Sequence, residues 1–299
     1  MPRFVYAALI LLSLIWGGSF YFIKMLLLDF GPWTIAFLRS ACGLIVVAII
    51  MLALKKPFAF RTIPWLAMGM MSIINTAIPW ALIGFSETRL TSSMASILNA
   101  TTPIWTIVVG MLFFGQKSGR AQWLGICIAS FGLIILVGIE SGSFLSVDTL
   151  GVICMLAASI CYGIGSQLSK RLLNGFSMYQ ITFGTLLGCM LATGSMAFTV
   201  EEAALSHLAS LHTVLMLVGL GGLGSGIAYI LFYYIVQKGS PEFATMVTYL
   251  VPCTALVWGS TLLDEEIRWN MLTGLFIILA GVFLAGRRRS GKRTTKADS

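Results

Sequence analysis

The sequence predicts an all-α membrane protein with ten transmembrane helices, arranged as two inverted five-helix repeats. Three observations predict it: the composition, the series of apolar segments and an internal repeat. The 299 residues are 58% hydrophobic and only 10% charged, whereas soluble domains carry roughly a quarter charged residues. A soluble chain of this length would need polar surface that this chain does not have. We therefore expect lipid to be the solvent for most of it.

Ten segments are apolar enough to cross a bilayer as helices, which takes about 20 residues each. They run over residues 5–27, 32–54, 64–85, 93–115, 121–139, 149–169, 177–199, 213–236, 241–263 and 270–286. The gaps between them are short and leave no room for a soluble domain. The first apolar run follows Arg3 and continues through Ile23 without a cleavage site. We interpret it as a retained span rather than a signal peptide.

The charged residues are distributed unevenly between the two sides of the predicted membrane. With the N-terminus inside, 15 of the 19 Lys and Arg residues are cytoplasmic, and only Arg89 and Arg268 fall outside. Nine acidic residues fall outside: Asp29, Glu87, Glu140, Asp148, Glu201, Glu202, Asp264, Glu265 and Glu266, of which the last three are interpreted as a solvated turn. Basic residues favour cytoplasmic loops, so both termini are predicted in the cytoplasm. The net charge of +8 reflects this topology and does not indicate a nucleic-acid partner.

The second half of the chain repeats the first. A shift of 149 residues places 92–138 on 241–287 without a gap, and a shift of 146 aligns the earlier spans. Matched pairs include Trp16 with Tyr162, Gly17 with Gly163, Pro103 with Pro252, and Gly132 with Gly281. Five spans per half is an odd number, so the halves cross the membrane in opposite senses. We predict repeats at 1–140 and 148–287, followed by a basic cytoplasmic tail at 288–299. Inverted repeats are typical of transporters that bind substrate near the midplane.

Short motifs recur at matching places in the two halves. They are Ile15-Trp16-Gly17-Gly18 and Cys161-Tyr162-Gly163, Phe37-Leu38-Arg39, the pairs Pro103/Gly110 and Pro252/Gly259, and the glycine pairs Gly125/Gly132 and Gly274/Gly281. Together they resemble the EamA family of the drug/metabolite transporter superfamily over nearly the whole chain. The resemblance implies a ten-helix transporter of a bacterial plasma (inner) membrane, often an exporter of amino acids or other small metabolites. The chain departs from the family at Gln116, where a glutamate is usual.

Polar and aromatic residues inside the spans are candidates for lining a passage. We expect substrate binding at Trp16, Ser19, Arg39, Asn75, Trp80, Asn99, Trp105, Tyr162, Gln167, Tyr229 and Tyr249, with Thr102, Ser166, Ser225, Tyr233 and Thr248 as further candidates. Apolar pockets with a few polar anchors are typical small-molecule sites. Each residue alone also suits packing or an interhelix hydrogen bond.

Two features within the spans leave alternatives open. Arg39 lies seven residues into its span, roughly 10 Å deep at 1.5 Å per residue. It would attract a carboxylate substrate, or else serve structure by pairing with carbonyls or with Asp29, while Lys24 is interpreted as snorkelling outward. Prolines interrupt three spans as candidate hinges or fixed kinks, and these are Pro79, Pro103 and Pro252.

The predicted spans contain no Asp, Glu or His near their middle, which disfavours a carboxylate proton relay and a permanently cationic substrate. The six cysteines lie in apolar stretches without a C-x-x-C pair, so no metal site is expected. We predict a secondary transporter that exports small metabolites, such as amino acids or amphipathic compounds, by alternating access through a central cavity. No enzyme activity, catalytic residue or cofactor is expected, and the oligomeric state is left open. The alternative is an integral membrane enzyme acting on a lipid or prenyl substrate.

Overall fold

The computed structural model describes residues 3–58, 60–115, 119–138, 148–172, 176–201, 205–238 and 247–286. Every element in these ranges is helical. Several predicted features lie outside the described residues, namely the basic tail at 288–299, Gln116, Glu140, Glu202 and the side chain of Tyr233.

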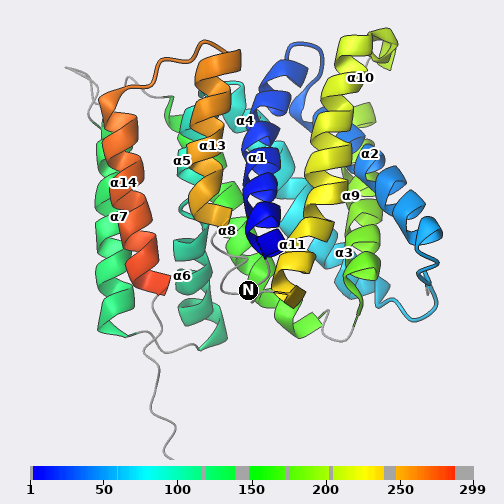
Figure 1. Ribbon diagram of the computed structural model, residues 1–299, viewed down its shortest axis with the longest axis horizontal. Coiled ribbons are helices and arrows are strands. Elements are labelled where there is room, and N and C mark those ends of the chain that lie inside the picture. The colour runs from blue at the N-terminus through cyan, green and yellow to red at the C-terminus, as the bar shows by residue number, and fades with distance from the viewer. Residues whose placement is uncertain are drawn as a thin grey trace, which may run out of the picture.

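The helices form one bundle (Figure 1). The first half contains α1 (Arg3–Leu26), α2 (Pro32–Ala53), the run α3 (Trp65–Ser72), η1 (Ile73–Ala77) and α4 (Ile78–Glu87), then α5 (Ser92–Asn99), α6 (Thr102–Phe114) and α7 (Arg120–Gly138). The second half contains α8 (Thr149–Leu172), α9 (Met178–Val200), η2 (Leu205–Ala209), the run α10 (Leu211–Leu217), η3 (Val218–Ile227) and α11 (Ala228–Lys238), then α13 (Val247–Leu262) and α14 (Trp269–Gly286).

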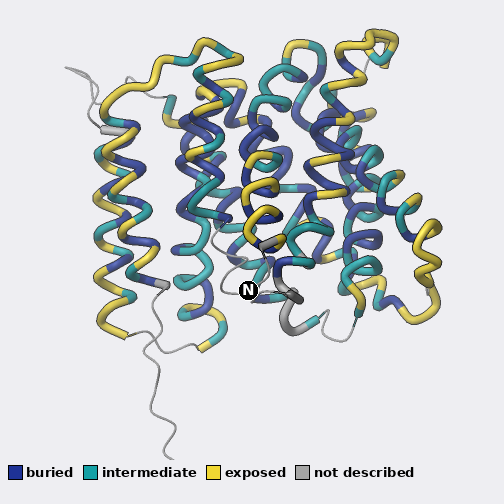
Figure 2. Tube along the Cα trace, in the orientation of Figure 1, coloured by how far each residue is buried: buried dark blue, intermediate teal, exposed yellow. Residues whose placement is uncertain are grey.

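Seven of these helical runs are both long enough and apolar enough to span a membrane. Three shorter apolar helices, Arg120–Leu136, Val247–Leu262 and Trp269–Ala285, complete the set of ten among the described residues. Large apolar side chains point outward, with Leu66 83% and Phe276 75% exposed. Figure 2 shows exposed residues along the outward faces and buried ones toward the centre. The prediction of an all-α, multi-pass membrane protein is confirmed.

Three of the predicted spans are interrupted rather than continuous α-helices. The third contains the π-helix η1, the eighth contains the π-helix η3, and the fourth breaks at Ala100 and Thr101 between α5 and α6. Pro103 stands in the first turn of α6, where its missing N–H costs no helical hydrogen bond. It therefore begins a helix rather than kinking one. Pro252, in contrast, lies inside α13.

Glycines allow α7 and α14 to pack closely at one edge of the bundle (Figure 1). A Cβ atom on Gly125 would lie 2.5 Å from the carbonyl oxygen of Gly281, and one on Gly274 would lie 3.1 Å from that of Gly132. Backbones approach this closely only where both helices present small residues. The repeated glycine pairs of the sequence therefore meet one another across this interface.

Contacts between the two halves occur in matching pairs. The helix α1 packs on α13, η3 and α11, while α8, its counterpart in the second half, packs on α6, η1 and α4. The pairs α2 with α9 and α7 with α14 each join counterpart helices. Exchanging the halves therefore maps this set of contacts onto itself.

We call the end of the bundle where α2 and α5 begin the outer end, after the predicted topology. The first residues of α1 and the last of α14 lie at the opposite end (Figure 1). At the outer end, Asp148 accepts hydrogen bonds from the Gly151 N–H at 3.0 Å and from Nη1 of Arg89 at 2.9 Å. These two hydrogen bonds lower the pKa of Asp148 below its ordinary value.

Two more carboxylates at the outer end cap helices of the other half. Glu201 accepts hydrogen bonds from the N–H groups of Trp33 and Thr34 at 2.9 and 2.8 Å. Glu265 accepts from those of Ser92 and Ser93 at 2.7 and 2.9 Å. Carboxylates favour helix N-termini because free N–H groups and the helix dipole are both positive there. The expectation of a purely solvated turn is therefore wrong for Glu265.

Candidate substrate-binding site

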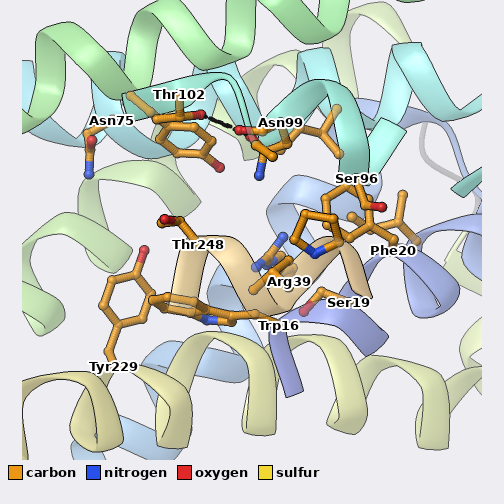
Figure 3. Close-up of a pocket in the computed structure, with 16 residues that line it drawn as sticks. Trp16, Ser19, Phe20, Arg39, Asn75, Ser96, Asn99, Thr102, Tyr229 and Thr248 are labelled. Atoms are coloured by element: carbon orange, nitrogen blue, oxygen red, sulfur yellow. Dashed lines mark hydrogen bonds between the residues drawn. The ribbon is translucent and has the colours of Figure 1, made fainter. Parts of the chain in front are cut away.

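A cavity of about 260 Å³ lies between the two halves, and Figure 3 shows its lining. Its walls are formed by Trp16, Ser19, Phe20, Ile23, Arg39, Asn75, Ile83, Ser96, Asn99, Ala100, Thr102, Tyr162, Tyr229, Thr248, Val251 and Pro252. In this view Arg39 lies between Trp16 and Ser19 on one side and Asn99 on the other. No Asp or Glu is among these residues, so the lining carries one formal positive charge.

Most of the predicted binding residues come together here. Seven of the principal candidates line the cavity, namely Trp16, Ser19, Arg39, Asn75, Asn99, Tyr162 and Tyr229, together with Thr102, Thr248 and Pro252. Four others stand outside the lining. Gln167 donates from Nε2 to the Thr106 carbonyl at 3.1 Å, and Trp80 lies under Arg39. Trp105 has a buried indole N–H without a partner in the described chain, and Tyr249 packs against the core.

The remaining lining residues were not singled out from the sequence: Phe20, Ile23, Ile83, Ser96, Ala100 and Val251. For some of them, helical spacing from a predicted lining residue indicates the same helix face. Phe20 and Ile23 follow Trp16 by four and seven residues, so all three share one face of α1. Ser96 precedes Asn99 by three residues on α5.

The guanidinium of Arg39 is held from two sides and open on a third. Its Nε donates to Oγ of Ser225 at 2.8 Å, and Cζ lies 4.0 Å from the ring centroid of Trp80. The residue is buried, with 7% exposed. No carboxylate of the described residues lies within ion-pair distance, since Asp29 instead accepts from Thr213 at 2.9 Å. The Nη groups, which donate to no described residue, are therefore available to a ligand.

The aromatic side of the cavity is built on α1, the π-helix η3 and the start of α11. The indole N–H of Trp16 donates to the Gly224 carbonyl at 3.2 Å, and its ring meets Tyr229 edge-on at 6.1 Å between centroids. The same π-helix holds Ser225, the partner of Arg39. Irregular turns of this kind are frequent at functional sites because they redirect backbone groups.

Three prolines stand four residues after three polar lining residues. Pro79 follows Asn75, Pro103 follows Asn99, and Pro252 follows Thr248. A proline cannot donate to the carbonyl four residues before it. At Asn99 the carbonyl instead accepts the Thr102 hydroxyl at 2.7 Å. Each proline thus withholds a helical N–H donor from the carbonyl of a lining residue, and at Pro103 this coincides with the break between α5 and α6.

Counterpart residues of the two halves line the same cavity. The shift of 146 pairs Trp16 with Tyr162, and the shift of 149 pairs Asn99 with Thr248; all four line the wall. The cavity therefore lies where the two halves meet.

Two charged residues near the outer end differ from their predicted positions. Glu87 was expected in an outer loop, but it ends α4 and is fully buried at 0% exposure. Lys24 was interpreted as snorkelling outward. Its Nζ instead donates to the carbonyls of Glu87 and Leu90 at 2.6 and 2.9 Å, capping the end of α4. No cluster of His, Cys, Asp or Glu suited to a metal occurs among the residues that the structure describes.

Comparison with known proteins relates nearly the whole chain to membrane transporters. The model of the EamA-like transporter family matches residues 3–138 and 149–287. The uncharacterized inner membrane transporter YedA of Escherichia coli K12 is 28% identical over 287 residues, covering 94% of this chain and 90% of YedA. A "Probable terminal-alkyne amino-acid exporter" of Streptantibioticus cattleyicolor is 25% identical, covering 96% of this chain and 94% of that protein. A solved crystal structure shares the fold with a TM-score of 0.68 at 14% identity, covering 96% of this chain and 97% of the other.

Proposed function

Because the chain belongs to the EamA-like transporter family, we propose that it exports small zwitterionic metabolites, amino acids above all, through the central cavity by alternating access. The family and its relatives are named as transporters, so the protein is a membrane transporter and not a lipid- or prenyl-modifying enzyme. The proposal concerns the substrate, the direction and the mechanism. It places both termini in the cytoplasm of a plasma (inner) membrane.

The substrate class is inferred from Arg39, whose guanidinium is buried in the cavity wall without a carboxylate partner among the described residues. A buried guanidinium without a carboxylate partner is costly unless its donors are satisfied. A substrate carboxylate would accept from the open Nη groups in the two-pronged geometry that arginine favours. The amide oxygens of Asn75 and Asn99 and the ring face of Trp16 suit the ammonium group of the same molecule.

The size and chemistry of the cavity limit the substrate. Its volume of about 260 Å³ falls below the range of roughly 300–1,000 Å³ that is usual for drug-sized ligands. Apolar and aromatic walls at Phe20, Ile23 and Tyr229 would accept an apolar side chain. A single amino acid of medium size fits these limits, and the printed name of the Streptantibioticus relative is consistent with them.

The mechanism is supported by the repeat. The family model matches each half separately, and the helix contacts map onto themselves when the halves are exchanged. Such a pair of inverted units opens to one side by the same motion that closes it to the other. The π-helices η1 and η3 and the break before α6 offer places where the halves bend, with Pro79, Pro103 and Pro252 as the proposed hinges.

Transport in proteoliposomes tests this function. We expect the purified protein to move one or more apolar amino acids, and we expect their amides, which lack the carboxylate, to compete at least about tenfold more weakly, since one charge-assisted hydrogen bond is worth about 1.5–3 kcal/mol. Arg39→Met should abolish this discrimination. The matched control is Arg89→Met, which removes an exposed arginine of the outer end. Equal competition by acid and amide in the wild type would refute the carboxylate role.

A further inference from the structure

The Glu87 carboxyl group is buried without a charged partner. The residue has 0% exposure, and Oε1 has no hydrogen-bond partner in the described chain. The ammonium of Lys24 is close but donates to the backbone carbonyl of Glu87 rather than to its carboxyl group. An ionised carboxylate in this position would lose its hydration without a compensating cation, which costs several kcal/mol.

The hydrogen bonds of Ser92 indicate which form of the acid fits. Its Oγ lies 3.3 Å from the Phe20 carbonyl oxygen and 3.0 Å from Oε2 of Glu87. A hydroxyl has one hydrogen to donate, and a carbonyl oxygen only accepts. Both contacts become hydrogen bonds when Ser92 donates to Phe20 and the protonated acid of Glu87 donates to Ser92. With an ionised Glu87, Ser92 can donate to only one of the two oxygens, and the other contact is not a hydrogen bond.

Charged and titratable groups face Glu87 from each helix around it. They are Lys24 on α1, Arg39 on α2 and Glu265 before α14. None of these cations forms an ion pair with the carboxyl group. Glu265, a like charge, is connected to the same serine because it accepts the Ser92 N–H at 2.7 Å. Burial of the carboxyl group is the largest effect and disfavours the ionised form of Glu87, as does the proximity of Glu265, whereas Lys24 and Arg39 favour that form.

Glu87 lies one turn outward of the cavity. It follows the lining residue Ile83 by four positions on α4, and Ser92 precedes the lining residue Ser96 by four positions on α5. Ser92 and Ser96 are 1% and 0% exposed. The Glu87–Ser92 contact therefore joins the end of α4 to the start of α5, one turn outward of the cavity, where Glu87, Ser92 and Ser96 are all buried.

We propose that Glu87 is a proton-binding site that holds the outer end closed. The closed state contains the carboxylic acid, whose O–H donates to Ser92. Opening admits water, the O–H bond breaks heterolytically, and the carboxylate remains on Glu87 while the proton passes to external water. Protons bind the closed state better than the open one, so acidic external pH favours closure.

This inference rests on the alternating access proposed above, but its first test needs no transport. Infrared difference spectra between the wild type and Glu87→Gln at neutral pH should show the carbonyl stretch of a protonated carboxylic acid in the wild type alone. Ser92→Ala is a second variant, which should shift the frequency of that band because it removes the acceptor. Identical carboxylic-acid bands in wild type and Glu87→Gln would overturn the proposal.

The second test measures opening. In a background without the six native cysteines, Ser96→Cys is labelled from outside with a membrane-impermeant thiol reagent. Relative to Glu266→Cys, an exposed control, labelling should rise from acidic to alkaline pH, by at most about tenfold per pH unit for one linked proton. Adding Glu87→Gln should keep labelling low and remove this rise. A rise of the same size in that variant would contradict the proposal.

The two proposals fail separately. A carboxylic-acid band at Glu87 without flux of any tested amino acid would count against the transport function alone. Flux without that band, or with a pH-dependent accessibility that Glu87→Gln does not alter, would count against the proton site alone.

Discussion

Arg39 depends on its neighbours for the orientation of its charge. The guanidinium lies over the ring of Trp80 and Ser225 accepts from Nε, which leaves the Nη donors for the cavity. A lysine in this place would keep the charge but lose both the stacking plane and the fork of donors. The orientation of the Arg39 side chain therefore depends on side chains that do not line the cavity.

Ser225→Ala tests this dependence. The change removes the hydrogen bond to Arg39, and one hydrogen bond to a charged group is worth about 1.5–3 kcal/mol. We expect the KM for a transported amino acid to rise about tenfold or more, with little change in the folded fraction. Ser195→Ala is the matched control, since the Ser195 hydroxyl contacts only its own helix at the Ala192 carbonyl. Equal KM values for both variants would contradict the role of Ser225.

At the scale of elements, glycines decide how closely helices pack. A Cβ on Gly281 would lie 2.5 Å from the Ala129 nitrogen on α7, whereas one on Gly69 in α3 would meet nothing within 4 Å. Both glycines lower intrinsic helix stability equally, but only at Gly281 would a larger side chain collide with the neighbouring helix.

The pair Gly281→Ala and Gly69→Ala separates these effects. Overpacking should destabilise the first variant by about 1–3 kcal/mol. The second should be neutral or slightly more stable, by up to about 1 kcal/mol, because alanine favours helix. Thermal unfolding in detergent measures both. A Tm for Gly281→Ala at or above the wild-type value would show that α7 and α14 separate without cost.

The carboxylate caps connect elements of opposite halves. Glu265→Gln replaces the charge that binds the N-terminus of α5, and loss of such a cap costs about 0.5–2 kcal/mol. The outer end should then open more easily, which the Ser96→Cys labelling described above would register as a higher rate. Glu266→Gln, one residue on and exposed, is the control. Equal labelling of the two variants would exclude a role for the cap in closure.

For the whole molecule, the inverted arrangement requires both termini on one side of the membrane. Affinity tags added to each end should be reached by a protease only after the cytoplasmic side is exposed, while Glu266→Cys should react with an impermeant reagent in intact cells. Tags on opposite sides would refute the ten-span inverted topology.

Composition and periodicity predicted the spans because apolar length is a local property. They also predicted most of the cavity wall, since Trp16, Asn75, Asn99 and Tyr229 stand out as polar or aromatic residues within apolar helices. Other features depend on tertiary contacts. Trp80, which follows the π-helix η1, contacts Arg39 and is not in the wall. Glu87 lies next to a predicted loop, and only the packing of α1 and α5 buries it.

Arg39, the one charged residue in the cavity wall, has no charged counterpart in the second half. The shift that pairs the early spans places Arg39 opposite Thr185, whose hydroxyl bonds its own helix at the Ile181 carbonyl. Two similar halves thus enclose a cavity whose lining has one charged side chain, on one half only. Under the proposed mechanism, a solute bound at Arg39 would keep one orientation during transport, and a molecule with an acid group at each end would have only one of them neutralised.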